Sequence, residues 1–473
     1  MANLANCNHV ELAFWPSRRT EEQVREALQI TSPARKKSKT SSKTKDGFSA
    51  THTAGFELPR AWTFPAPLVL PSDTLEDDPD YPVQTVQDWI DEDARNEVTQ
   101  ERRTIYLVPP PSISEEVEFA RDWTLPPTAW AGPRRKHAKI PIPTPSFDDV
   151  IEYLQAFYRG LKVQAMKTPS IEFMQWDSPA RKGKARESYA NDCRHIALST
   201  GDEAIRVRCR PPPDRVYLKQ LNLNDLLDAA LSILPDDAYA LLMLVDHDLY
   251  EDEEDDFCCG RAYGGSRVAV VSTARYRPEL DKVRRNDSLG HRWHAWPNSH
   301  CKQYSSRHFS SMAPMYPPGG GWAKSATEFH PGSAMASAVV ASSALPLAKS
   351  PAELSTVWLG RICKTASHEL GHCLGIDHCT YYACVMQATS KILEDYRQPP
   401  YLCPIDLKKV LTATEAGEED RYKALLTFCD RRQDNRMFAG YGAWLRTRLE
   451  ALGGPALAFR MASTASSYDI LAI

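Results

Sequence analysis

The sequence has no long apolar run, no dense cysteine spacing and no large excess of one charge. No hydrophobic run approaches the roughly 20 residues of a membrane span, and the start, MANLANCNHVELAFW, lacks the basic stretch and apolar core of a secretion signal. Twelve cysteines among 473 residues are too sparse for a disulfide scaffold. A formal charge of −4 argues against a general nucleic-acid binder. We therefore expect a cytoplasmic protein, with the nucleus as the alternative, that binds neither membranes nor nucleic acids, and the sequence leaves its oligomeric state open.

Proline is abundant, at 35 residues, while 42% of the residues are hydrophobic. This composition indicates a globular part joined to long irregular segments. Residues 1–100 are rich in proline, serine, threonine and charge, and predict a mostly irregular extension with some anchored pieces. Residues 101–410 are the predicted main domain, and residues 411–473 a C-terminal helical segment. Within the main domain, residues 281–349 predict a low-complexity insertion that is either disordered or a lid.

Apolar periodicity predicts helices and strands that alternate along the main domain. The expected helices cover residues 147–158, 221–234 with Asn224 as the cap, and 351–374 with a cap at Ser350. The expected strands are TIYLV after Arg103, residues 171–176, residues 239–245 and residues 267–276. The last of these strands either forms a sheet edge, where an extended peptide could pair with it, or is an ordinary core strand. This mixture predicts an α+β fold.

Residues 368–378 have the sequence HELGHCLGIDH, on which the interpretation of the chain depends. His368 and His372 are four residues apart, so on a helix they project from one face and can share a metal ion. Gly375 can adopt the positive φ that ends a helix, after which the returning chain brings His378 close as a third ligand. A surface helix with this histidine spacing by chance would leave Gly375 and His378 unexplained. Three imidazoles with a fourth position open to water predict a catalytic zinc site.

Glu369 stands beside the first histidine, where a metal site of three imidazoles has no need of it as a ligand. Zinc in such a site makes water nucleophilic at neutral pH and polarises a carbonyl group. Glu369 is then the expected general base, which takes a proton from the water and passes it to the leaving amine. This chemistry predicts hydrolysis of peptide bonds in a peptide or protein substrate.

The motif resembles the signature of the metzincin zinc metallopeptidases, and its continuation resembles the archaemetzincin family. Cys379 directly follows the third histidine, Cys384 comes five residues later, and Met386 stands where the family has a methionine turn beneath the metal. The resemblance is strongest over residues 350–410. It implies a zincin-like domain with a mixed twisted sheet, a long active-site helix and C-terminal helices, and an activity of aminopeptidase type.

The resemblance also implies a second, structural zinc, which the family holds with four cysteines. In this chain the fourth cysteine is replaced by an aspartate, since CPID stands where the family has CxxC. The expected ligands are Cys379, Cys384, Cys403 and Asp406. An aspartate oxygen is an acceptable zinc ligand, although thiolates are the softer partners. Two alternatives stay open: Cys363 or Cys373 replaces the aspartate, or the cysteines are simply buried and no second zinc binds.

A different class of function also stays open at this point. The chain could be a zinc-stabilised binding or adaptor protein that keeps the metzincin fold without useful proteolysis. The insertion at 281–349 could then cover the cleft, and the extension at 1–100 could bind partners. Glu369 argues against this alternative, because a purely structural zinc does not require a general base.

Overall fold

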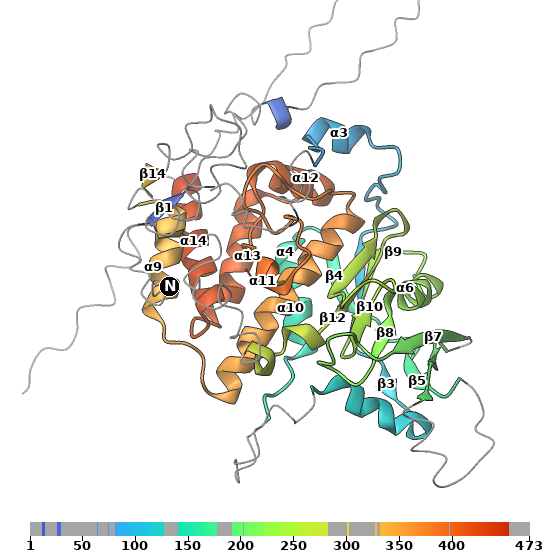
Figure 1. Ribbon diagram of the computed structural model, residues 1–473. Coiled ribbons are helices and arrows are strands. Elements are labelled where there is room, and N and C mark those ends of the chain that lie inside the picture. The colour runs from blue at the N-terminus through green and yellow to red at the C-terminus, as the bar shows by residue number, and fades with distance from the viewer. Residues whose placement is uncertain are drawn as a thin grey trace, which may run out of the picture.

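The protein is described by a computed structural model in residues 12–14, 26–29, 64, 74, 81–126, 141–176, 192–201, 203–281, 300–301, 327–328, 332–396 and 398–453. The basic run at 34–45 and most of the insertion at 281–349 lie outside these ranges. In the described ranges, the two larger sheets lie on one side of the molecule and most of the helices on the other (Figure 1). This is an α+β architecture, as the sequence predicted.

A five-stranded mixed sheet packs against the helix that contains His368 and His372. Its strand order is β11 (Gly260–Tyr263), β12 (Val268–Ser272), β9 (Ala238–Val245), β2 (Thr104–Val108) and β4 (Lys162–Ala165). The strands from β12 to β4 are parallel neighbours, and β11 pairs antiparallel with β12. All eight side chains of β9 are buried, as expected for a parallel strand covered on both faces.

The prediction for residues 267–276 needs one correction, because the strand in this segment ends at Ser272 and is followed by short 3₁₀ turns. The strand lies between β9 and β11, so of the two alternatives the ordinary core strand is the one that the structure has. The edge strand on this side is β11, which folds back onto β12 through the turn Gly264–Ser266 and the left-handed residue Arg267.

A six-stranded sheet stands beside the first, and only one of its strands was predicted. The order is β10 (Asp248–Tyr250), β8 (Gln220–Asn222), β7 (Ala204–Arg210), β6 (His195–Ser199), β5 (Glu172–Met174) and β3 (Ser112–Ile113). A further three-stranded group joins β1 (Leu12–Phe14) to β13 (His300–Cys301) and β14 (Thr327–Glu328). Most of these strands have two to five residues, too few for a clear period-two pattern.

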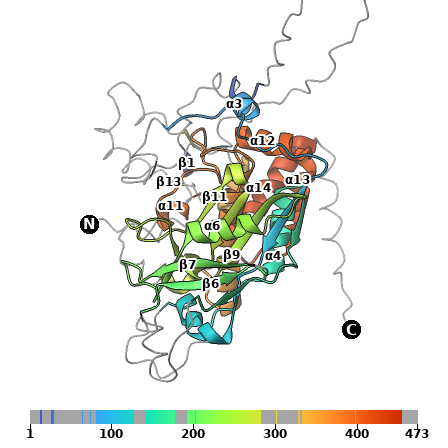
Figure 2. The same cartoon turned by 90° about the vertical axis from the view of Figure 1, so that its right-hand side faces the viewer.

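The long helix α10 (Pro351–Cys373) packs against β11 and β12 on one side and against α4 (Phe147–Phe157) on another. It begins as predicted, because Ser350 and Glu353 form a capping box. The helix α6 (Leu223–Ser232) covers the sheet on the face that Figure 2 turns to the viewer. Its cap is Asn222, whose side chain accepts a hydrogen bond from Asp225 N, and not Asn224 as predicted.

The remaining helices form the helical side of the molecule. They are α9 (Ala334–Ala344), α11 (Ile392–Asp395), α12 (Pro404–Thr414), α13 (Glu418–Asp430) and α14 (Arg436–Gly453). α14 packs against α9 and α13, and α13 packs against α4. In the described part of the chain, none of the helices combines the length and apolar character needed to cross a membrane.

Residues 81–96, called the arm below, lie against the C-terminal end of α10. The arm contains the short helix α3 (Val86–Asp91), which starts with a capping box between Thr85 and Asp88 and packs on α12. Trp89 is buried, and its Nε1 donates to the carbonyl oxygen of Leu374 at 2.8 Å. The arm falls within the predicted extension at 1–100. The division of the chain at residues 100 and 410 stays a prediction.

Candidate metal centre

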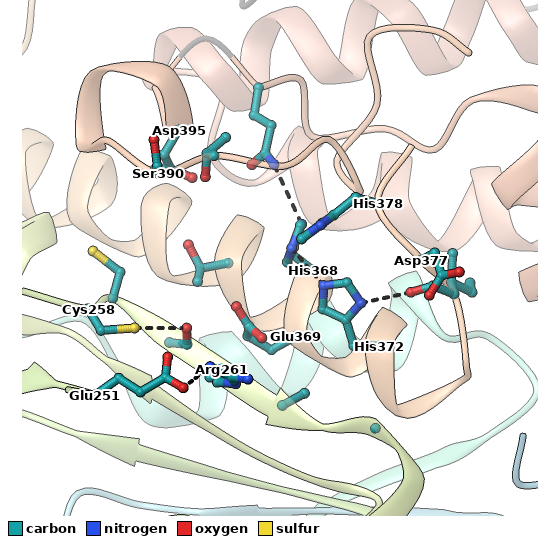
Figure 3. Close-up of a pocket in the computed structure, with 18 of the residues that line it drawn as sticks. Glu251, Cys258, Arg261, His368, Glu369, His372, Asp377, His378, Ser390 and Asp395 are labelled. Carbon is teal, nitrogen blue, oxygen red and sulfur yellow. Dashed lines mark hydrogen bonds and ion pairs between the residues drawn. The ribbon is translucent and has the colours of Figure 1, made fainter. Parts of the chain in front are cut away.

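Helix α10 and the turn that follows it bring together His368, His372 and His378, called the histidine cluster below (Figure 3). The first two project from the last turns of the helix. Gly375 has φ +75°, a left-handed conformation that glycine adopts without strain. The chain then turns back and places one ring nitrogen of His378 with those of the other two, all within 4.8 Å of one another. The predicted geometry of the motif is therefore present.

Hydrogen bonds on the outer ring nitrogens orient the two helical histidines. Nδ1 of His368 lies 2.7 Å from the carbonyl oxygen of Val385. Nδ1 of His372 lies 2.7 Å from the carbonyl oxygen of Ile376. A carbonyl oxygen only accepts, so both Nδ1 atoms carry the proton and donate it. The two Nε2 atoms are then unprotonated, yet they lie 3.1 Å apart. Two lone pairs at this distance fit a shared cation.

The surroundings keep all three imidazoles neutral, which is the form that binds a metal. Burial, followed by the neighbouring rings, holds the pKa of His368 well below its usual range. Burial also lowers the pKa of His372. The same cause lowers the pKa of His378 to about 3.

Glu369 lies beside the histidine cluster on the wall of a cavity and is only 7% exposed. Burial raises the pKa of its carboxyl group to about 8. The edge strand β11 approaches it closely, since a β-carbon on Gly260 would lie 3.4 Å from Cγ of Glu369. A carboxyl group in this place can exchange a proton with a molecule held in the cavity.

The backbone of the helix is packed tightly on both sides of the motif. A β-carbon on Gly264 would lie 2.5 Å from the carbonyl oxygen of His372, so the turn after β11 rests directly on the helix. Met386 contacts the helix at Gly371, where a β-carbon would lie 2.4 Å from its Sδ atom. The sulfur of Met386 therefore lies against the helix at the residue before His372.

A cavity of about 770 Å³ opens in front of Glu369 and the histidine cluster. Figure 3 shows Arg261 and Glu251 near Glu369, and these two side chains form an ion pair. The other charged residues that line the cavity are mostly acidic: Glu92, Asp255, Asp377 and Asp395, against Arg95 and Lys391. The cavity is large enough for a short peptide segment.

Cys379, Cys384, Cys403 and Asp406 form a second group, called the cysteine cluster below, whose ligand atoms also lie within 4.8 Å of one another. All four residues are buried. The Sγ atoms of Cys379 and Cys403 are 3.5 Å apart. Oδ2 of Asp406 lies 3.3 Å from Sγ of Cys384 and 3.5 Å from Sγ of Cys403. Three soft sulfurs and one oxygen, all buried, fit a closed four-ligand zinc site.

Among the candidates for the fourth place, only Asp406 lies with the three cysteines. Cys363 and Cys373 are buried on α10 and do not belong to the cluster. Asp406 belongs to it, and its other oxygen, Oδ1, lies 3.0 Å from Nζ of the buried Lys409. Burial raises the pKa of Asp406 to about 7, and Lys409 opposes that rise.

Three residues near the two clusters were not predicted from the sequence: Tyr81, Gln84 and Lys409. Lys409 follows Asp406 by three residues on α12, a spacing at which an ion pair could have been expected. The capping box in the arm marks the start of a helix in the same way. Tyr81 and Gln84 carry no local signal, since their contacts are with residues about 300 positions away.

Comparison with known proteins places this part of the chain among peptidases. Residues 335–411, which include both clusters, match the model of peptidase family M54. Archaemetzincin-2 of Macaca fascicularis is 28% identical over 211 residues, which are 45% of this chain and 47% of that protein. Archaemetzincin-1 of Homo sapiens is 27% identical over 232 residues, 49% of this chain and 38% of that protein. The chain thus spans about half the length of the curated relatives it matches, or less.

A solved structure shows a more distant similarity. The archaemetzincin of Methanopyrus kandleri aligns with 67% of this chain and 98% of its own, at 16% identity and a TM-score of 0.29. A similarity at this level does not bear on the details of the fold.

Proposed function

Because the chain belongs to the archaemetzincin family, peptidase family M54, we propose that it is a zinc-dependent metallopeptidase with the metzincin fold. The histidine cluster would hold the catalytic zinc. The observation that carries this proposal is the pair of unprotonated Nε2 atoms of His368 and His372, 3.1 Å apart beside Glu369. A cation between those atoms would relieve the repulsion of their lone pairs, and Glu369 stands beside them on the wall of the cavity.

Zinc bound there would supply a Lewis acid that makes water nucleophilic at neutral pH. The residues of the chain then have separate tasks. Val385 and Ile376 accept the Nδ1 protons, which keeps Nε2 of His368 and His372 directed at the metal. Glu369 takes the proton of the attacking water and returns it to the leaving amine. Burial raises its pKa, so the protonated form is accessible near neutral pH.

The proposed substrates are extended peptides that pair with β11, the edge of the mixed sheet. A peptide antiparallel to β11 has its amino end near Tyr263. Just beyond that strand end, Nδ2 of Asn96 in the arm donates to the carbonyl oxygen of Gly265 at 2.8 Å. The arm therefore limits the room for residues before the cleaved bond, which supports cleavage of aminopeptidase type. A comparison of peptides with free and acetylated amino ends tests this, and equal cleavage of both would contradict it.

We also propose that the cysteine cluster holds a second, structural zinc. Its position supports this role, because Cys379 directly follows His378 and its backbone N–H donates to the carbonyl oxygen of Met386 at 2.8 Å. A metal at the cysteine cluster would fix the chain that returns beneath the histidine cluster. Zinc content of the purified protein is expected to approach two ions per chain.

The decisive experiment compares the wild type with Glu369→Gln. The substitution keeps the size of the side chain and removes its ability to accept the proton as a carboxylate. Zinc content should be unchanged, and peptide turnover should fall at least about a hundredfold. Unchanged turnover would reject Glu369 as the general base. Retained zinc in a wild type that cleaves no peptide from a broad library would instead favour the binding or adaptor alternative.

A further inference from the structure

We infer that the arm, residues 81–96, positions the third histidine for metal binding, with Tyr81 and Gln84 as the positioning residues. The inference rests on the proposed function of the histidine cluster as a metal site. His368 and His372 are held by the helix that carries them, but His378 lies on the turn after Gly375. Its position therefore depends on what packs against that turn.

Tyr81 contacts the ring of His378 directly. The hydroxyl oxygen of Tyr81 lies 3.3 Å from Nδ1 of His378, and the two ring centroids are 5.7 Å apart. When the other ring nitrogen of His378 is a ligand, Nδ1 carries the proton and donates it to the hydroxyl. Tyr81 thus does for the third histidine what the carbonyl groups of Val385 and Ile376 do for the first two.

Gln84 fixes the backbone of the turn on both sides of Ile376. Its Nε2 donates to the carbonyl oxygen of Gly375 at 2.9 Å. Its Oε1 accepts from the backbone N–H of Asp377 at 3.2 Å and from Nζ of Lys409 at 2.8 Å. The amide of Gln84 therefore spans the turn that leads to His378, and all three of its contacts lie far away in the sequence.

The contact with Lys409 connects the two clusters through the arm. Lys409 is 2% exposed and donates from the same Nζ to Oδ1 of Asp406 at 3.0 Å. A hydrogen-bonded path thus runs from Asp406 through Lys409 and Gln84 to the turn before His378. It is separate from the direct link through Cys379, which follows His378 in the chain.

The rest of the arm covers the turn and leaves it little room to move. Trp89 donates to the carbonyl oxygen of Leu374, the residue that ends α10. Arg95 lies over the ring of Trp89 at 4.3 Å and packs on Gly375, where a β-carbon would come within 2.9 Å of its Cγ atom. A ligand held in its binding geometry before the metal arrives binds that metal more tightly, because less ordering remains to be done.

The test is metal binding by the full chain with cobalt as the probe. Cobalt bound by thiolates gives a charge-transfer absorption that a site of histidines lacks, so the two clusters can be titrated separately. Tyr81→Phe keeps the ring against His378 and removes only the hydroxyl. Cobalt affinity at the histidine cluster should fall about 10- to 100-fold, as is typical when the partner of a metal-binding histidine is lost.

The matched control is Tyr106→Phe. The hydroxyl of Tyr106 also makes a hydrogen bond, to Asp237 at 3.0 Å, but on the other side of the sheet from the clusters' helix. This variant should bind cobalt like the wild type. A second variant, Gln84→Met, removes the contacts of the amide with the turn and should also weaken binding at the histidine cluster. In both arm variants the melting temperature of the metal-free protein should stay within a few degrees of the wild type.

Affinity at the histidine cluster within twofold of wild type in both arm variants would overturn the inference. So would an equal loss at both clusters together with a large drop in the metal-free melting temperature, because this would indicate a general structural role. Peptide cleavage by the wild type is assayed separately. A wild type that binds cobalt at the histidine cluster and cleaves nothing would reject the proposed function and leave the role of the arm intact.

Discussion

Gly264 lies so close to His372 that a β-carbon on the glycine would be 2.5 Å from the carbonyl oxygen of the histidine. Both groups belong to the backbone, so a change of side-chain rotamer cannot relieve the contact. It joins the turn after the edge strand β11 to the helix that carries two of the three histidines. The edge strand and the metal site are thereby held in one fixed relation.

We predict that Gly264→Ala pushes β11 away from α10. Overpacking of this kind costs about 1–3 kcal/mol of unfolding free energy. Metal affinity at the histidine cluster should also fall, because the carbonyl group that must move belongs to a ligand residue. Gly265→Ala is the matched control, since a β-carbon there meets nothing within 4 Å. Urea unfolding and cobalt titration of both variants provide the measurement, and equal behaviour of the two would contradict the prediction.

A second prediction concerns Asp406, whose Oδ2 lies near the cysteine sulfurs of the cluster and whose Oδ1 lies near Nζ of Lys409. Asp406→Ala should release the second metal and leave the buried Lys409 without its carboxylate, at a cost of about 3 kcal/mol. Asp406→Cys should retain the metal, because it completes a set of four thiolates. Zinc content by mass spectrometry decides between these outcomes. Full zinc content in Asp406→Ala would show that the aspartate is not a ligand.

The sequence predicted the elements whose signals are local. The capping box at Ser350 and the glycine at 375 gave both ends of α10, and the run Tyr239–Val245 gave most of β9. The structure also brings together the members of both expected ligand sets. The histidine set followed from spacing along the chain, and the cysteine set followed from the family resemblance. For these elements the local pattern and the tertiary structure agree.

Other features depend on contacts that the sequence does not display. β11 has four residues, and its place at the edge follows from its pairing with β12. Asn222 and not Asn224 caps α6, although both residues are asparagines and asparagine is a good cap. Tyr81 and Gln84 contact the site from a segment that precedes it by almost 300 residues. Long-range packing decides such positions, and no period or motif reveals them.

A third prediction concerns Arg275, which lies 2% exposed between two carboxylates. Its Nε donates to Oδ1 of Asp248 at 2.7 Å, and Asp248 is completely buried. Arg275→Met would leave that carboxylate without its main partner. The expected cost is about 3–5 kcal/mol of unfolding free energy.

The control for Arg275 is Arg121→Met, which removes the exposed ion pair with Glu118. Its melting temperature should equal that of the wild type, since exposed pairs contribute little. Thermal unfolding of both variants in the same buffer provides the comparison. A loss in Arg275→Met as small as in the control would mean that the buried carboxylate finds another partner.

A final prediction follows from His247, which is 2% exposed and packs between the rings of Trp123 and Phe173. Its Nε2 lies 3.1 Å from the carbonyl oxygen of Ala120. Burial lowers its pKa to about 4, below the usual value of 6.5. As the pH falls below 6.5, the unfolded chain takes up a proton that the folded chain refuses, so stability falls until the pH reaches about 4.

Between pH 7 and pH 5 this single group should remove roughly 2 kcal/mol from the unfolding free energy. The glutamine in His247→Gln can still donate to the carbonyl oxygen of Ala120 and does not titrate. Between pH 7 and pH 5 the unfolding free energy of this variant should therefore fall by roughly 2 kcal/mol less than that of the wild type. Urea unfolding at the two pH values gives the difference for each chain. A pH dependence shared by both chains would place the acid sensitivity elsewhere, whereas its loss in His247→Gln would assign it to the protonation of one buried ring.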